Sequence, residues 1–490
     1  MKKFIYSYDL EIAIFFSGAL IMILELVGSR ILAPYVGTSI YVWTNLIGVV
    51  LASLSIGYWL GGKIAFQESS RKTLSNIILI TTIFISITAL FNNLLIKEIL
   101  YHVKNYISTA FISSLILFAP SNILLAMFSP YIIQLRLKDL NKTGETVGNL
   151  YALSTIGSIF GTFFSGFFLI SYLGSTKILF IIPIALLCIS MLLYRTKGNF
   201  FKTFILILVI FILFKLYDIK LKSKIIDLDT KYNRVRIIDY KKVRTMILGN
   251  LSSSGQSLVN DDPSFNIYNY FVLSNYFNPN IHNILVIGGA GYTWPIHLLK
   301  NDQTFKLDVV EIDPELTVLA KKYFNLKNDP RLSIYHEDGR TFINRNNNKY
   351  DAIFIDVFNS YAPPFQLTTK ETIDKIYSML NDKGLVIMNM TSAVEGPKGE
   401  LLRSEFYTYK NSFPQVYVFP TGLDGQKIQN IILIGYKSNM KITLKSNDER
   451  FKKYLNHLWT KKIPQDLPLL TDDFAPVEHY LGFYQQYFNK

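Results

Sequence analysis

The stretch NILVIGGAGYTWPIHLLK, residues 283–300, decides the fold of the C-terminal part of the chain. The apolar run NILVI is typical of a buried strand, which stops at two glycines and is followed by a helical pattern. A strand, a glycine turn and a helix in this order outline a nucleotide-binding turn, because glycine lets the backbone approach a ligand closely. We therefore expect a ligand site at this turn.

The chain beyond this stretch keeps alternating between strand and helix patterns. Candidate strands lie at residues 283–289, 306–312, 332–336, 351–356, 384–390 and 430–436. Helical stretches separate the first five, which predicts a parallel sheet with helices on both faces. Residues 231–259 instead alternate apolar and polar side chains between glycine-containing breaks, which indicates short antiparallel strands.

Acidic side chains end three successive predicted strands. Glu311 closes the second strand, Asp338 the third and Asp356 the fourth. In such sheets the ligand lies beyond the carboxyl ends of the strands, and an acid about 20 residues after the glycine turn binds ribose hydroxyls. Any strand can end in an acid, but three acids around a glycine turn favour a nucleoside site. A P-loop lysine is absent, so a nucleoside triphosphate is not favoured.

The first 217 residues have a different composition from the rest. They hold 16 Lys and Arg with 7 Asp and Glu, whereas residues 218–490 hold 34 and 29. Seven apolar segments, against the ~20 residues that a helix needs to cross a bilayer, predict a transmembrane domain. They are residues 12–33, 40–62, 74–95, 108–135, 147–172, 178–194 and 200–216.

Two kinds of residue stand out within these apolar segments. Gly157 and Gly161 lie four residues apart, a spacing that lets membrane helices pack closely. Glu25 lies in the middle of the first segment, where a carboxylate is costly unless it has a partner or lies beside water. Arg30 can extend its charge to the interface, so Glu25 is the better candidate for a polar cavity or an inter-helix partner.

Several classes of function are disfavoured by composition. The chain has one cysteine, Cys188, so no intrachain disulfide forms, and its six histidines show no metal-ligand spacing. The formal net charge of +14 comes from dispersed lysines without an aromatic-interleaved basic face, which argues against nucleic acid. Attraction to anionic lipid headgroups is the simpler explanation of this charge.

Four motifs of the C-terminal half resemble the S-adenosylmethionine-dependent polyamine aminopropyltransferases, the spermidine synthases. They are VIGGAGYT, VVEIDPEL, YHEDGRTF and YDAIFIDVFNSYAPPFQLTTKE, and the resemblance covers about residues 230–440. Two further motifs, LELVGSRILAPYVGTSIYVWTNLIGVVLASLSIGYWLGG near the start and LTDDFAPVEHYL near the end, resemble the bacterial membrane-fused branch of that family. Together the motifs span most of the chain.

The resemblance implies a three-part organisation. We expect a transmembrane domain of about seven helices over residues 1–217, a β-hairpin domain over 218–280, and a Rossmann-like, class I methyltransferase-like catalytic domain over 281–490. The implied substrates are S-adenosylmethionine or its decarboxylated form, together with an amine. No metal cofactor is expected.

The resemblance also assigns roles to residues around the predicted nucleoside. It implies that Asp356 is the proton acceptor. The remaining residues would hold the nucleoside: Gly288 and Gly289 in the turn, Glu311 on the ribose, Asp338 and Gly339 along the adenine, Pro363 over the methylthioadenosine, and Asn233 where the family usually has glutamine.

Three positions on the acceptor side depart from the family. Asn269 replaces the histidine of the hairpin motif, Gly291 replaces the aspartate of the glycine turn, and Asn359 replaces the second aspartate of a paired motif. The nucleoside side is thus kept while the amine side is neutralised. This pattern argues against ordinary putrescine aminopropylation.

Three functions are favoured by the sequence, ahead of a transporter with an accessory domain and of ordinary methyl transfer on the same scaffold. The leading one is a membrane-embedded enzyme that transfers an aminopropyl group to an unidentified amine and releases methylthioadenosine. The first alternative is an acceptor-independent S-adenosylmethionine cyclase or lyase that gives methylthioadenosine and homoserine lactone. The second is a non-catalytic, nucleoside-sensing membrane protein, although the retention of Asp356 argues against it.

The expected location is the bacterial inner membrane, in which the chain is a multi-pass protein. Basic residues in alternate loops favour an exterior soluble half, whereas the lysines after the last apolar segment favour the opposite. Because S-adenosylmethionine is made in the cytoplasm, we expect the soluble half there. The expected partners are the nucleoside substrate and membrane lipid, with no nucleic acid, and a homodimer stays open.

Overall fold

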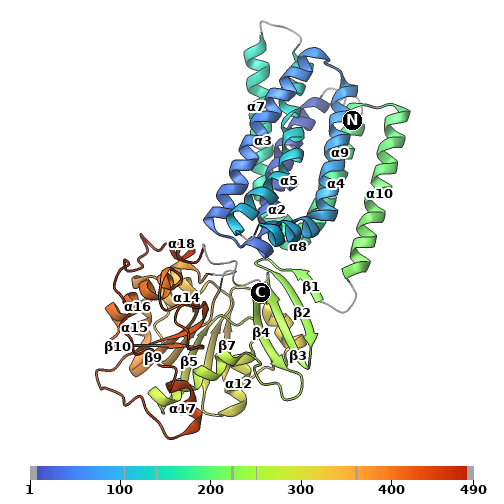
Figure 1. Cartoon of the computed structure of the whole chain (residues 1–490). Coiled ribbons are helices and arrows are strands. Elements are labelled where there is room, and N and C mark those ends of the chain that lie inside the picture. Colours follow the sequence, from blue (N-terminus) through green and yellow to red (C-terminus); the bar gives the residue numbers. More distant parts are fainter. Residues whose placement is uncertain are drawn as a thin grey trace. The chain divides into compact units, whose positions relative to one another are not determined.

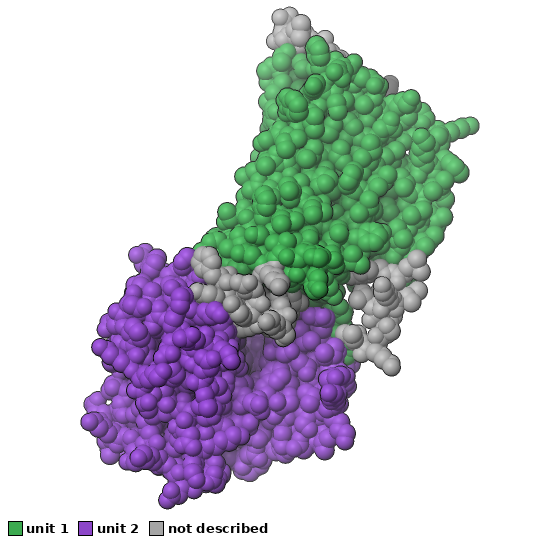
Figure 2. Space-filling view, viewed as in Figure 1, with its two compact units in different colours: residues 1–234 green, residues 235–490 purple. Residues whose placement is uncertain are grey.

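The computed structural model describes residues 8–103, 105–137, 142–221, 226–249, 251–358 and 362–482. The chain divides into two compact units, Met1–Arg234 and Val235–Lys490 (Figure 2). The first unit is a bundle of long helices, and the second is built around a mixed sheet with helices (Figure 1).

Within the described residues, unit 1 contains seven helical spans long and apolar enough to cross a membrane. Their agreement with the seven predicted segments indicates a multi-pass membrane protein. The spans are α2 (Asp9–Val36), α3 (Ile40–Gln67), α4 (Arg71–His102), α5 (Tyr106–Ala126) with α6 (Phe128–Arg136), α7 (Thr143–Phe164) with a π-helical turn (Ser165–Leu169) and α8 (Ile170–Leu173), α9 (Ser175–Leu193), and Lys197–Lys215 of α10 (Lys197–Leu221).

Close packing of α7 against α2 explains the small residues of the fifth span. A Cβ added to Gly157 would overlap the carbonyl of Phe15, and one added to Gly161 would overlap the carbonyl of Ala19. The backbones therefore touch without a side chain between them. The packing role that the spacing of these two glycines predicts is confirmed.

The two ionisable residues predicted to matter in α2 have different environments. The Arg30 guanidinium donates to the backbone carbonyl of Tyr232 at 2.7 Å and to that of Lys231. Glu25 is half-buried near the middle of the helix. Its role in a polar cavity or substrate path stays a prediction.

A four-stranded sheet follows the helices. Its order is β1 (Ile226–Asp229), β2 (Arg234–Tyr240), β3 (Val243–Leu248) and β4 (Leu251–Ser257), and β2, β3 and β4 pair antiparallel. The short antiparallel strands expected at residues 231–259 are therefore present. Alternating burial along β2, with Val235 and Ile237 facing inward, matches the alternation seen in its sequence.

The seven-stranded sheet of unit 2 contains every strand predicted after residue 283. Its order is β10-β11-β9-β8-β5-β6-β7, in which the five strands from β9 to β7 are parallel and β11 pairs antiparallel with both β9 and β10. The strands are β5 (Asn283–Ile287), β6 (Lys306–Val310), β7 (Leu332–Tyr335), β8 (Tyr350–Ile355), β9 (Leu380–Ser392), β10 (Gln415–Pro420) and β11 (Gln429–Tyr436).

Helices accompany these strands, and together they form a mixed α/β, methyltransferase-like fold, as predicted (Figure 1). The chain runs outward from β5 through β6 to β7 and then returns to the other side of β5 with β8. The switch point between β5 and β8 is where a ligand is expected. The helices are α11 (Leu273–Phe277), α12 (Thr293–Asn301), α13 (Pro314–Tyr323), α14 (Gly339–Arg345), α15 (Lys370–Met379), α16 (Glu400–Ser412), α17 (Glu449–Leu455) and α18 (Val477–Gly482), with 3₁₀ turns at Asn266–Val272, Phe365–Leu367 and Pro397–Gly399.

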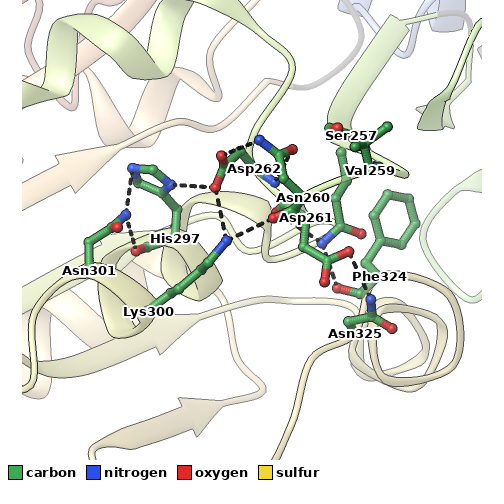
Figure 3. A network of polar contacts seen from close by, with 11 residues as sticks. Ser257, Val259, Asn260, Asp261, Asp262, His297, Lys300, Asn301, Phe324 and Asn325 are labelled. Carbon is green, nitrogen blue, oxygen red and sulfur yellow. Dashed lines mark hydrogen bonds and ion pairs between the residues drawn. The ribbon is translucent and has the colours of Figure 1, made fainter.

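A polar network joins the loop after β4 to the helix that follows the glycine turn (Figure 3). Lys300 of α12 donates to the Asn260 carbonyl at 2.8 Å and lies 3.3 Å from the Asp262 carboxylate. The His297 ring lies 3.5 Å from the same carboxylate, and burial lowers the pKa of this histidine. The network thus ties the loop after β4 to α12.

The first prediction tests the close approach of α7 and α2. Gly157→Ala places a methyl group against the Phe15 carbonyl, so we expect the free energy of unfolding in detergent to fall by about 1–3 kcal/mol. Gly148→Ala is the matched control, because it lies on the same helix with nothing within 4 Å of its added Cβ. Equal unfolding midpoints for the two variants would contradict this packing.

Candidate functional site

The glycine turn that the sequence predicts is present after β5, and three of its residues have left-handed backbone conformations. Gly288 has φ +98°, and Ala290 and Tyr292 also lie in the left-handed region, with φ 43° and 56°. A Cβ on Gly288 would overlap the carbonyl of Asp356, because the turn crosses directly over the end of β8. Glycine is therefore required at residue 288 by both the dihedral angle and the neighbouring strand.

The turn is held by the carboxylate of Glu311. One carboxylate oxygen accepts the backbone N–H groups of Gly289 at 2.9 Å and Ala290 at 2.8 Å, while the other accepts the N–H of Asp313 at 2.9 Å. The side chain is buried, with 6% exposed. Burial raises the pKa of Glu311, and the three backbone donors act in the opposite direction.

These contacts give Glu311 a structural role that its sequence position did not reveal. The ribose role implied by the resemblance stays a prediction, and the hydrogen-bonding capacity of the carboxylate is compatible with it. Each carboxylate oxygen has two lone pairs, and the oxygen bonded to Asp313 has one described donor. Glu311 is thus able to shape the turn and to accept a hydroxyl at the same time.

Asp356 lies at the end of β8, beside the turn. Its backbone N–H donates to the Ile287 carbonyl at 3.0 Å, and its carboxylate accepts the Asn389 amide at 2.9 Å. Burial raises the pKa of Asp356, while the hydrogen-bonding groups of Asn389 and Tyr268 pull it downward. A carboxylate whose pKa is raised is a stronger base and is better suited to accept a proton from an amine.

Asn389 and Tyr268 were missed from the sequence. Asn389 lies in the middle of β9 and is buried, and its own Oδ1 is one of the buried oxygens without a partner among the described residues. Tyr268 is buried in the 3₁₀ turn before α11 and stacks on Trp294 with 5.9 Å between ring centroids. Neither belongs to a local motif of acids or glycines. The pairing of β9 with β8 brings Asn389 to Asp356, and Tyr268 comes from a 3₁₀ turn that packs on Trp294 of α12.

The predicted adenine-side residues gather near the same strand ends. Asp338 caps α14 by accepting the Thr341 N–H at 3.0 Å. A Cβ on Gly339 would lie 2.9 Å from the Ile287 side chain, which immediately precedes the glycine turn. Pro363 is buried in the loop that follows β8.

Arg340 ties this adenine side to two distant segments, a role that the sequence did not indicate. Its guanidinium donates to the Gln366 carbonyl at 3.0 Å, to the Thr369 hydroxyl at 2.9 Å and to the Asp472 carboxylate at 2.6 Å. The second oxygen of Asp472 accepts the Thr369 hydroxyl at 2.6 Å. Asp472 belongs to the motif LTDDFAPVEHYL, to which the sequence alone assigns no role for individual residues.

The acceptor-side positions are polar or small within the described residues. Asn269 is exposed. The Gly291 N–H donates to the Ser254 hydroxyl at 2.9 Å, and a Cβ on Gly291 would lie 2.8 Å from the Ser254 Cβ. Asn359 lies outside the described residues.

Two further expectations stay predictions. Asn233 belongs to the first unit by the division of the chain, where its backbone bonds to Thr230, so it is not placed at the turn. Among the parts of the chain that the structure describes, no three His, Cys, Asp or Glu side chains are grouped to hold a metal ion.

Comparison with known proteins supports this reading of the fold. Residues 272–422 match the family described as Spermine/spermidine synthase domain. The chain is 28% identical to the polyamine aminopropyltransferase of Lachnoclostridium phytofermentans over 178 residues, 35% of this chain and 61% of that protein. It is 29% identical to that of Alkaliphilus metalliredigens over 208 residues, 41% and 71% of the two chains.

A solved structure is similar to part of the chain. The crystal structure of a probable spermidine synthase from Corynebacterium glutamicum has a TM-score of 0.41 and 21% identity, and the match covers 46% of this chain and 83% of that chain. The match to the polyamine aminopropyltransferase of Lachnoclostridium phytofermentans spans about three fifths of that relative's length, at 61%. Residues 272–422 of the chain thus match the family described as Spermine/spermidine synthase domain, and they are preceded by helices long and apolar enough to span a membrane.

Proposed function

We propose that the chain is a membrane-embedded enzyme of the spermidine synthase type. It binds decarboxylated S-adenosylmethionine at the glycine turn, transfers the aminopropyl group to an amine and releases methylthioadenosine. The observation that carries this proposal is the position of Asp356, a half-buried carboxylate with an amide donor, beside a glycine turn in a domain of this family.

The reaction needs one base and one positioned electrophile. The acceptor nitrogen attacks the aminopropyl carbon next to the sulfonium, the carbon–sulfur bond breaks, and its electron pair leaves on the sulfur of methylthioadenosine. The ionised Asp356 takes the proton of the amine. Its raised pKa makes the carboxylate a stronger base than an exposed aspartate, and the turn fixes the distance between the reactants.

The acceptor side supports a second candidate. Gly291 and Asn269 place no carboxylate and no imidazole where the resemblance expects an aspartate and a histidine. A diammonium acceptor then lacks an anionic partner for its second charge, and burying an unpaired ammonium is costly. This neutrality favours either an acceptor with one amine or an acceptor-independent cleavage of S-adenosylmethionine to methylthioadenosine and homoserine lactone.

The proposed location follows from the proposed substrate. S-adenosylmethionine is a cytoplasmic metabolite, so the soluble half is placed on the cytoplasmic side of a bacterial inner membrane. The seven apolar spans support the membrane location.

Product analysis distinguishes these reactions. Purified protein is given S-adenosylmethionine or its decarboxylated form, with and without mono- and diamines, and the products are identified by mass spectrometry. We expect methylthioadenosine from the decarboxylated substrate only when an amine is present. Asp356→Asn should lower turnover by about 10²-fold or more, the range that a positioned base contributes.

Other outcomes decide between the alternatives. If methylthioadenosine and homoserine lactone form without an amine, the protein is a cyclase or lyase and not a transferase. Full turnover in correctly folded Asp356→Asn would refute the role of Asp356 as the proton acceptor. A non-catalytic nucleoside sensor would then be the favoured function. Methylthioadenosine affinity measured by calorimetry verifies that the variant still has a formed site.

The pH dependence of the rate tests how the hydrogen bond from Asn389 affects the pKa of Asp356. Asn389→Ala removes a donor that lowers the carboxylate pKa, so the pKa should rise and the acidic limb of kcat/KM should move to higher pH. The control is Asn430→Ala on the adjacent strand β11, whose Oδ1 lies 3.5 Å from the Thr391 hydroxyl. An acidic limb that stays in place in Asn389→Ala would show that the ionisation of Asp356 does not control kcat/KM.

The Arg340 contacts should matter for nucleoside binding. Arg340→Met frees α14, the loop before α15 and the segment at Asp472 from one another, so we expect methylthioadenosine affinity to fall about tenfold, equivalent to ~1.4 kcal/mol. Arg345→Met is the matched control, because Arg345 lies on the same helix and pairs with Glu337 at 2.8 Å, away from these segments. Calorimetry that shows equal losses for both variants would remove this positioning role.

A further inference from the structure

The membrane half contains a cavity between the end of α9 and the start of α10. Its volume is about 690 Å³, which lies within the range of small-molecule sites. Met191 and Leu192 from α9 and Phe200 and Phe201 from α10 form most of its apolar wall. It belongs to unit 1 and is separate from the glycine turn.

Two cationic side chains line the same cavity. Arg195 and Lys197 lie in and next to the short connection between the helices, and both are exposed. The Arg195 Nε donates to the Leu192 carbonyl at 3.0 Å, which keeps the side chain against the cavity wall. None of the nine lining residues is acidic, so the cavity presents positive charge at one end and hydrocarbon along its walls.

The connection that bears these charges is held by a buried polar cluster. The Asn199 amide donates to the Tyr194 carbonyl at 2.8 Å and to the Ser190 carbonyl at 3.2 Å, and its oxygen accepts the Ser75 hydroxyl at 3.2 Å. These bonds link α4, α9 and α10 within unit 1. The cavity is therefore preformed between fixed backbones rather than opened by a loop.

Helix α10 has few protein neighbours along its length. Only 17% of the most apolar stretch of α10 is buried inside the protein, against 56% for that of α9, although both are 19-residue spans. Among the described residues it packs mainly on α9 and less on α4, and Figure 1 shows it at the edge of the bundle. Phe200 is 62% exposed and Phe201 is 66% exposed, so apolar contacts for this end of α10 must come from outside the described protein.

We propose that this cavity binds an anionic phospholipid. The phosphate lies against Arg195 and Lys197, and an acyl chain fills the space between the apolar residues of α9 and α10. Basic pockets between membrane helices attract anionic headgroups, whereas a second copy of the chain would bring the same positive charges to this end of the helices. The bound lipid completes the packing of α10, and this role does not depend on the proposed reaction.

The only cysteine of the chain provides a site-specific reporter. Cys188 lines the cavity, so its reaction with a neutral maleimide measures whether the space is occupied. Full-length protein is placed in nanodiscs of phosphatidylcholine alone or with added phosphatidylglycerol. We expect phosphatidylglycerol to slow the reaction about tenfold, and the variant Arg195→Gln/Lys197→Gln to lose this protection.

A charge-matched control separates a site from general surface attraction. Lys63→Gln/Lys72→Gln removes two positive charges from residues that do not line the cavity, and its protection should equal that of the wild type. Equal reaction rates in the two lipid compositions, or equal protection in both double variants, would overturn the proposal. Cys188 could also be protected without phosphatidylglycerol, only in samples in which cross-linking detects dimers of the chain. That result would overturn the proposal in favour of a second copy as the occupant.

Discussion

The hydrogen bonds from the glycine turn to the Glu311 carboxylate are the interaction on which the candidate site depends. The left-handed backbone of this turn needs donors to be satisfied at the sheet edge, and a buried carboxylate with four acceptor positions supplies the partner. Because Glu311 follows β6 while the turn follows β5, the bonds also fix the ends of two parallel strands against each other. The space beyond the strand ends takes its shape from this contact.

The rest of the site is arranged around that edge by long-range contacts. The end of β8 passes under Gly288 and presents Asp356, and β9 presents the Asn389 amide to the carboxylate. On the other side of the turn, Arg340 joins the start of α14 to Asp472, which lies 132 residues further along the chain. The bond between Asn389 and Asp356 is partly removed from water and is stronger than it would be at an exposed surface, whereas the bond to Asp472 is exposed.

Helices α7 and α10 of the helical unit contact their neighbours in different ways. Along α7, the glycines Gly157 and Gly161 let the backbone touch α2, so contact between helices is as close as the geometry permits. Along α10, large aromatic side chains face outward, and a cavity lies between the end of α9 and the start of α10. The α7 and α10 spans each have only 17% of their most apolar part buried, an arrangement in which lipid covers apolar surface of both helices.

The sequence by itself determined the elements of both halves. Runs of apolar residues specified the seven spans and the strands from β5 to β9 and β11, because burial of apolar surface leaves a local period in the chain. The order of strands also implied that Asp338, Glu311 and Asp356 end at one edge of the sheet. The edge strand β10 was missed, since its six residues QVYVFP are short and end in proline.

Only the tertiary structure decided which groups meet. The bonds of Glu311 to the turn, of Asn389 to Asp356 and of Arg340 to Asp472 join residues 21 to 132 positions apart. Such pairs depend on strand order and helix placement, which leave no periodic signal in the residues themselves. Hydrophobic periodicity is a local property of the chain, whereas a hydrogen bond between distant segments exists only after the chain has folded.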